Sequence, residues 1–154
     1  MNSRSLLAGL LLASAVMPAP AQVPAPSASR ACLPAVEAGW VRLPPMSMPM
    51  LAGFATVRND CPAPVTVVSV SSPAFGAVEL HESTVVGGVS RMRAVPRLRI
   101  EAGETVVLEP GGLHLMLMQP VSMPKAGDRI EMVLTLDDGR QVRSRWQARA
   151  GGPH

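Results

Sequence analysis

The sequence predicts an all-β domain, and three observations lead to that expectation. Short runs of β-branched or alternating apolar residues recur from residue 39 onward, and clusters of Gly, Pro, Asn and Asp separate them. Sixteen of the 154 residues are proline, many of them near the N-terminus or between the apolar runs, which argues against long helices. Many short strands at even spacing are typical of a sandwich or barrel.

Ten segments carry the strand pattern. The alternation is strictest in LHLMLM (113–118), where three leucines share one face and His114, Met116 and Met118 share the other. Asp137-Asp138-Gly139 is a hairpin signal between two alternating segments. The expected strands, in chain order, are 39–43, 52–58, 65–70, 76–81, 89–94, 97–100, 105–109, 113–118, 130–136 and 140–147.

The N-terminal segment has the pattern of a secretory signal peptide. Arg4 precedes an apolar run from Leu6 to Val16 that is short for a bilayer span, and Ala19-Pro20-Ala21 offers a small-x-small cleavage site. We therefore expect removal of this segment on export and no membrane-spanning segment afterwards, because no later run is long and apolar enough. The expected organisation is a signal peptide at 1–21, a Pro/Ala/Ser-rich leader at 22–36, one folded domain at 37–148 and a short tail at 149–154.

The two cysteines, Cys32 and Cys61, favour a disulfide. An exported chain meets an oxidising compartment, and this bridge would tie the segment before the first strand to the turn near Asn59-Asp60. The alternative is that one cysteine ligates a metal, although neither has a His or Cys at ligand spacing beside it.

Composition argues against two broad functions. The net charge is only +3, the arginines are scattered, and the chain has no tyrosine and two phenylalanines, so it lacks the basic stripe and stacking aromatics of a nucleic-acid surface. There is no HExxH motif, no nucleophile elbow and no plausible pair of catalytic carboxylates. We expect neither a nucleic-acid partner nor an enzyme.

Histidine and methionine fall in a pattern that points to a soft metal ion. A hairpin between the strands that contain His81 and Met92 would bring these residues close, and the strand with His114 and Met116 would complete a set of two imidazoles and two thioethers. Thioether sulfur suits Cu(I), and imidazole suits copper and zinc. The absence of a cysteine ligand argues against a blue-copper electron-transfer centre.

A second interpretation of the same residues is structural. Methionine commonly fills gaps in cores, and a single histidine is more often packed or solvated than bound to a metal. On that interpretation, the chain is a structural or adhesive β-sandwich with an incidental His/Met face.

The spacing His81-x10-Met92-x21-His114-x-Met116 resembles the ligand motif of the PCuAC family of periplasmic copper chaperones. The flanking stretches GWVR, VELHE, GGVSRMR and PGGLHLMLM are similar too, and the resemblance runs from about Gly39 to about Trp146. It implies a cupredoxin-like Greek-key β-sandwich that binds one Cu(I) through these four side chains. It also implies a periplasmic protein that delivers copper to acceptor proteins of cytochrome c oxidase assembly; copper storage or tolerance is the alternative.

The chain departs from the family pattern in the segment 46–50 and in its tail, and Met118 is a further methionine that the motif does not use. Met46, Met48 and Met50 enrich a loop in thioethers, which suggests a weaker accessory metal site, a docking surface for copper exchange, or a loop whose methionines cap the sandwich. Met118 shares the face of His114 and is either an accessory contact or packing. Some relatives carry a long His/Met-rich extension that binds Cu(II); we expect no strong Cu(II) site in the tail GGPH, because His154 alone offers too few ligands.

Overall fold

The structure is a computed structural model that describes residues 32–46 and 48–151, and these residues form ten strands and no helix. None of the described residues therefore belongs to a helix able to cross a membrane. The expected signal peptide, most of the leader, Ser47 and the end of the tail with His154 lie outside the described residues. The strands are β1 (Ala35–Leu43), β2 (Met50–Arg58), β3 (Val65–Ser71), β4 (Phe75–Val86), β5 (Val89–Ala94), β6 (Leu98–Ile100), β7 (Thr105–Leu108), β8 (Leu113–Pro120), β9 (Arg129–Leu136) and β10 (Gln141–Ala150).

All ten predicted strands are present, with ends that differ by a few residues. The largest difference is in β4, which was expected to end at His81 and continues to Val86. The N-terminal part of β4 pairs with β8, and residues 81–86 pair with β5, so the predicted hairpin forms further along the chain. The extension was hard to predict because Glu82-Ser83-Thr84 lacks the apolar alternation of a half-buried strand.

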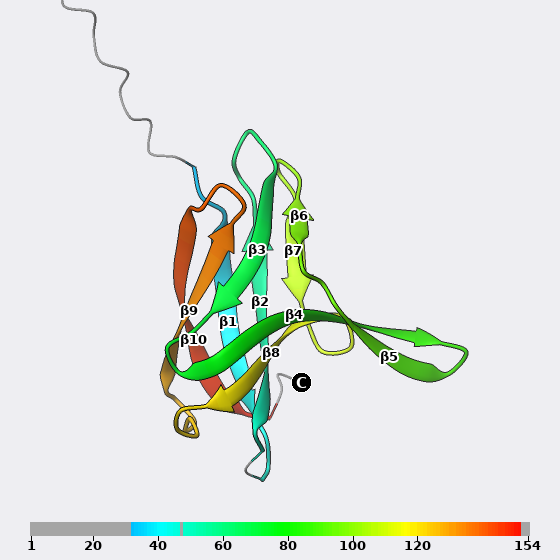
Figure 1. Cartoon of the computed structure of the whole chain (residues 1–154), viewed down its shortest axis with the longest axis vertical. Helices are drawn as coiled ribbons and strands as arrows, with labels where there is room; N and C mark the ends of the chain where they lie inside the picture. The colour runs from blue at the N-terminus through cyan, green and yellow to red at the C-terminus, as the bar shows by residue number, and fades with distance from the viewer. Residues whose placement is uncertain (1–31, 47, 152–154) are drawn as a thin grey trace, which may run out of the picture. The chain divides into compact units, whose positions relative to one another are not determined.

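The strands form a sheet that folds over on itself. The hydrogen-bonded order is β5-β4-β8-β2-β1-β10-β9-β3-β6, β7 pairs with β2, and only the β1–β10 pair is parallel. Leu115 and Leu117 of β8 share one core cluster with Met132 of β9 and Trp146 of β10, although β2 and β1 separate these strands in the order. Figure 1 shows β4 and β8 running across the direction of β1 and β2. The core therefore lies between two layers, as in the expected sandwich.

Trp146 joins β10 to β1 and β2. A Cβ atom added to Gly39 would lie 2.5 Å from Cδ1 of Trp146, and one added to Gly53 would lie 3.0 Å from its Cζ3. The indole is 1% exposed, and its Nε1 donates a hydrogen bond of 2.9 Å to Oγ of Ser144. Two glycines thus let a large ring pack directly on the backbone, which holds β1 and β2 against the core.

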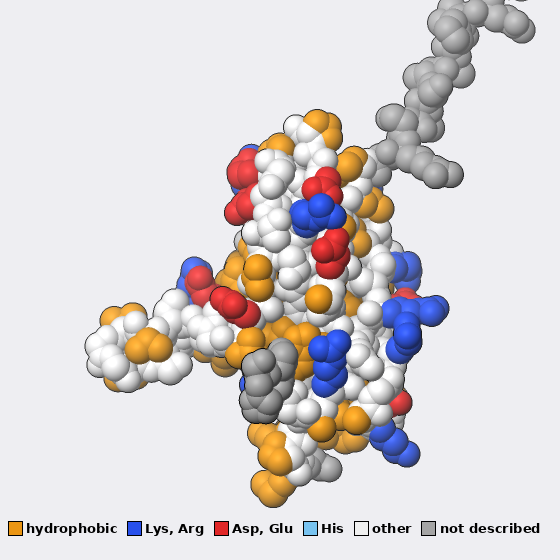
Figure 2. Space-filling model, turned by 180° about the vertical axis from the view of Figure 1, so that it is seen from behind, with side chains coloured by type: hydrophobic (Ala, Val, Ile, Leu, Met, Phe, Trp, Pro, Cys, Tyr) orange, Lys and Arg blue, Asp and Glu red, His pale blue; other side chains and the backbone are white. Residues whose placement is uncertain are grey.

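The end of the β4–β5 hairpin projects from the body as a two-stranded arm, which we define as residues 83–92 (Figure 1). Gly87 and Gly88 form its turn with φ angles of +59° and +76°, the left-handed conformation that a tight hairpin requires. Apolar side chains near the turn are exposed, and Figure 2 shows them gathered at the tip. They are Val85, Val86 and Val89. The arm has no layer packed over it within the described part of the chain.

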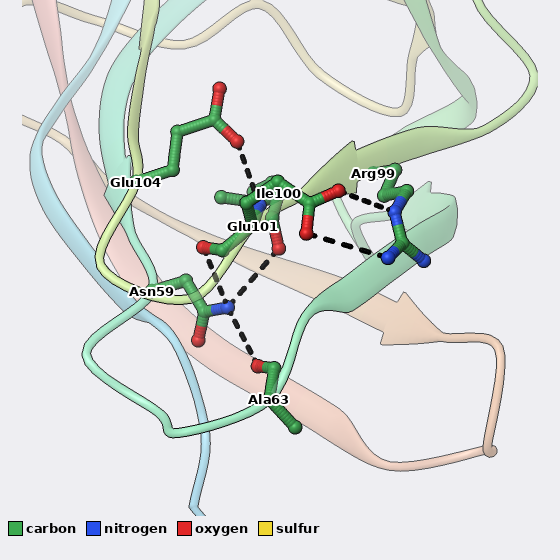
Figure 3. A network of polar contacts seen from close by, with 6 residues as sticks. All are labelled: Asn59, Ala63, Arg99, Ile100, Glu101 and Glu104. Atoms are coloured by element: carbon green, nitrogen blue, oxygen red, sulfur yellow. Dashed lines mark hydrogen bonds and ion pairs between the residues drawn. The ribbon is translucent and has the colours of Figure 1, made fainter.

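The turn after β2 is held by Asn59, which is completely buried (Figure 3). Its Nδ2 donates to the carbonyls of Ala63, Ile100 and Glu101 at 3.0–3.1 Å, and its Oδ1 accepts from the backbone N–H of Cys61. One side chain therefore satisfies several buried backbone groups. Cys61 also forms the predicted disulfide with Cys32, with a Cα–Cα distance of 5.6 Å.

Candidate metal site

The register between β4 and β8 places His81 directly opposite His114. The next same-face pair brings Glu79 opposite Met116, while Leu80 and Leu115 meet on the core face between them. The alternation predicted for LHLMLM is thus present: the leucines enter the core, and the His/Met face forms the outer side of the sheet.

The two imidazoles lie close enough for one metal ion. Their ring centres are 6.2 Å apart, and the ring planes are inclined by 38°. A metal–nitrogen bond of about 2.0 Å places the ion about 3 Å from the ring centre, so this separation corresponds to a wide, nearly linear arrangement. A small approach of the rings would give the narrower angle of a four-coordinate ion.

The hydrogen bonds of His114 leave one nitrogen free for a metal. Nδ1 of His114 lies 2.9 Å from the carbonyl oxygen of Gly112, which can only accept, so Nδ1 carries the proton. In the neutral ring, Nε2 then holds the lone pair. This arrangement is common for metal-binding histidines, whose second nitrogen donates to a carbonyl or carboxylate.

In His81 the roles of the two ring nitrogens are the reverse of those in His114. Its Nε2 lies 3.0 Å from Oε2 of Glu79, and the imidazole is only 16% exposed. Its Nδ1 is buried and has no hydrogen-bond partner among the described residues. A buried polar atom without a partner costs free energy, and a metal ion bound to Nδ1 would remove that cost.

Met92 and Met116 meet His114 in an open hollow of about 310 Å³. His81 is not part of the lining, but its ring stands next to that of His114. Met92 sits on β5 opposite Ser83, diagonal to His81, and is 53% exposed. The four residues expected as ligands therefore come from three strands and lie at one place on the sheet.

The accessory methionines fall at the same end of the sheet. Met50 is the direct cross-strand partner of Met118 and also lines the hollow. Met46 and Met48 are exposed, at 75% and 47%, so neither fills the core. The interpretations of these residues, as an accessory metal site, a docking surface or a loop that caps the sandwich, all stay predictions.

Two neighbours of the hollow were not anticipated as site residues. Arg42 lines the hollow, and its guanidinium carbon lies 5.0 Å from the ring centre of Phe54 and 5.6 Å from that of Trp40. Glu79 contacts His81, as described above. The spacing of Glu79 two residues before His81 on one strand face is a signal for this contact, whereas the position of Arg42 depends on the pairing of β1 with β2.

The side chains around the hollow supply donor atoms that favour a soft metal ion. Among the described residues, no three His, Cys, Asp or Glu side chains are grouped to hold a metal ion. Both cysteines are in the disulfide, so the hollow offers imidazole nitrogen and thioether sulfur only. Such a set suits a monovalent soft ion better than Mg²⁺, Ca²⁺ or Zn²⁺.

The profile of a protein family described as "Putative lipoprotein LpqE-like" matches residues 34–147. The chain belongs to this LpqE-like family. A related protein, "Putative lipoprotein Lxx21020" of Leifsonia xyli subsp. xyli, is 34% identical over 136 residues, which cover 88% of this chain and 79% of that protein. This LpqE-like chain has no cysteine outside its disulfide.

Solved structures also match the LpqE-like chain. The solution structure of CuI-DR1885 from Deinococcus radiodurans is 28% identical with a TM-score of 0.63, covering 80% of this chain and 84% of that one. The copper-bound PCuAC domain from PmoF2 is 22% identical with a TM-score of 0.62, covering 75% and 92%. The predicted all-β, cupredoxin-like fold and the resemblance to the PCuAC family are confirmed by these matches together with the family profile.

Proposed function

We propose that the protein is a periplasmic copper chaperone that binds one Cu(I) through His81, Met92, His114 and Met116. The observation that carries the proposal is the convergence of these four side chains from β4, β5 and β8 on one place of the sheet. Two similar solved structures are copper-bound, one of them with Cu(I), which supports copper as the ion.

The ligand chemistry explains why the ion would be Cu(I) and why it would be cargo. Four neutral ligands leave a net charge of one on the bound ion, which is cheaper to bury partly than a divalent charge. Thioethers hold Cu(I) less strongly than thiolates do. An acceptor protein with a pair of cysteine thiolates would therefore displace the ligands in turn and take the ion without any change of oxidation state.

The different exposure of the ligands predicts the order in which an acceptor would displace them. Met92 is half exposed, whereas His114 is 9% exposed and hydrogen-bonded to the backbone. The first bond that an acceptor replaces is expected to be the one to Met92, and the histidines are expected to release last. The proposed destination of the copper is the assembly of cytochrome c oxidase copper centres, with no catalytic turnover by the chaperone itself.

The direct test is Cu(I) binding by the mature chain under anaerobic conditions with ascorbate, in competition with a colorimetric Cu(I) chelator. We expect one tight equivalent, and at least about 100-fold weaker binding in His114→Ala and Met116→Leu. Met123→Leu, which replaces an exposed methionine outside the lining of the hollow, is the matched control and should bind as the wild type does. Tight binding that survives His114→Ala would contradict the proposed ligand set.

Delivery needs a separate test in cells. A strain lacking the protein should lose cytochrome c oxidase activity when copper is scarce, and wild-type protein should restore this activity while His114→Ala should not. A copper-storage or tolerance protein would instead leave the oxidase unaffected at low copper and reduce survival at high copper.

A further inference from the structure

The proposed four-ligand site does not use all the thioethers at its edge. Met50 and Met118 are directly opposite each other on β2 and β8, and Ala52 and Met116 form the next same-face pair. Directly opposite residues of an antiparallel pair have Cβ atoms about 5 Å apart, and diagonal neighbours remain within reach of long side chains. Met50, Met118 and Met116 therefore form a triangle on the outer face.

The surroundings leave room at this triangle. The fourth corner of the two pairs is Ala52, whose methyl group takes little space, and both Ala52 and Met50 line the same hollow as Met116. Met50 is 38% exposed, so its thioether is not used to fill the core. Unbranched methionine side chains are flexible enough to turn their sulfurs toward one ion.

The segment that carries Met50 is held beside β8. The backbone N–H of Gln119 donates to the carbonyl of Pro49 at 2.9 Å, which continues the β2–β8 pairing just beyond Met50. This bond fixes the position of Met50 relative to Met118. Met48 lies further out and is more exposed, so it is not needed for the triangle.

We propose that Met50, Met118 and Met116 form a second Cu(I) site, weaker than the four-ligand site and adjacent to it. The inference rests on the proposed function, because Met116 belongs to both ligand sets. When both ions are bound, the Met116 sulfur would bridge them, with one of its two lone pairs directed to each ion. Three thioethers bind Cu(I) without imidazole, and the first bound ion repels the second, so the second site binds less tightly. Its role is to receive or release the ion at the start of β2, by ligand exchange around Met116.

The test measures Cu(I) stoichiometry against two chelators of different strength. In competition with the weaker chelator, the wild type should bind two equivalents of Cu(I) per chain. In competition with the stronger chelator, it should keep one equivalent. Met50→Leu/Met118→Leu, which conserves volume, should lose only the weaker equivalent, with an apparent affinity at least about 10-fold lower for that ion. Met46→Leu/Met48→Leu is the matched control from the same segment and should keep both equivalents.

The outcomes separate this inference from the proposed function. One equivalent in the wild type, lost in His114→Ala, would overturn the second site and leave the chaperone proposal intact. Loss of the weaker equivalent in Met46→Leu/Met48→Leu, with retention in Met50→Leu/Met118→Leu, would also overturn it. If His114→Ala lost the tightly bound Cu(I) and kept the weakly bound Cu(I), the result would support two separate sites. No copper uptake by the wild type would overturn both proposals.

A fold check accompanies each variant, because Met50 and Met118 lie within paired strands. Thermal unfolding without copper should change little for the Leu substitutions. A Met50→Gln/Met118→Gln variant provides a second measurement: it removes sulfur and keeps chain length, and it should lose the same equivalent. NMR of selectively labelled methionine methyl groups should show shifts at Met50, Met116 and Met118 during the second equivalent, and absence of those shifts would contradict the assignment.

Discussion

His81 and His114 occupy opposed positions of β4 and β8, with their ring centres 6.2 Å apart. The spacing of the two imidazoles is thus set by the β-ladder itself rather than by a loop. A slip of one residue in this pairing would move His114 to the core face, so the buried leucines of β8 also maintain the register of the site. The proposed ligands on β4 and β8 are consequently pre-organised by the same contacts that stabilise the domain.

The contact between Glu79 and His81 leads to a first prediction. Glu79→Gln should weaken Cu(I) binding by about 10-fold, because the carboxylate that accepts from Nε2 orients the ring and makes Nδ1 the stronger donor. Chelator competition at fixed pH measures the affinity. Glu109→Gln, at an exposed position outside the hollow, is the control, and an equal loss in both variants would show that Glu79 acts only through general charge.

The position of Arg42 leads to a second prediction. Arg42→Gln should tighten Cu(I) binding by roughly 2–5-fold, because a like charge is removed from the lining of the hollow. The gain should shrink as ionic strength rises, since salt screens the interaction. Arg129→Gln changes net charge equally at an exposed position and should have no such effect. Weaker binding in Arg42→Gln would mean that its packing on Trp40 and Phe54 matters more than its charge.

A third prediction concerns the buried Asn59. Asn59→Ala should lower the free energy of unfolding by roughly 2–4 kcal/mol, because the carbonyls of Ala63, Ile100 and Glu101 lose their donor. Chemical denaturation measures the change. Glu104→Ala removes a single exposed acceptor of the same loop and should cost less than about 1 kcal/mol. Similar losses in both variants would contradict the central role of Asn59.

The disulfide leads to a fourth prediction. Replacing both Cys32 and Cys61 by Ser should lower the free energy of unfolding by roughly 2–4 kcal/mol, since a bridge of sequence separation 29 restricts the unfolded chain. Cu(I) stoichiometry should not change, because Cys61 follows the end of β2 opposite to Met50, about 25 Å away along the strand. If the folded double variant lost its copper, the result would indicate that one of the cysteines is a metal ligand.

Several features could be predicted from the sequence because they depend on short-range patterns. The alternation of LHLMLM, the turn at Gly139 and the positions of all ten strands follow from side-chain period and turn chemistry. The disulfide followed from having only two cysteines. The set of four ligands remains a prediction, although the structure brings its members together.

Other features depended on long-range pairing and could not be read from one segment. The pairing of Met50 with Met118 requires the register between β2 and β8, and the place of Arg42 requires that between β1 and β2. The burial of Asn59 was missed because asparagine in a turn is usually interpreted as local turn chemistry. Here two of its partners, the carbonyls of Ile100 and Glu101, are more than 40 residues away.

The arm carries one of the proposed ligands on a strand with a single neighbour. Within the described part of the chain, β5 pairs only with β4, so the end with Met92 can separate without disturbing the core. We therefore expect the residence time of the bound ion to depend on how often this hairpin opens, and not only on the strength of four bonds. Substitutions at Gly87 or Gly88, which touch no ligand, would then change how long copper stays bound while leaving the identity of its ligands unaltered.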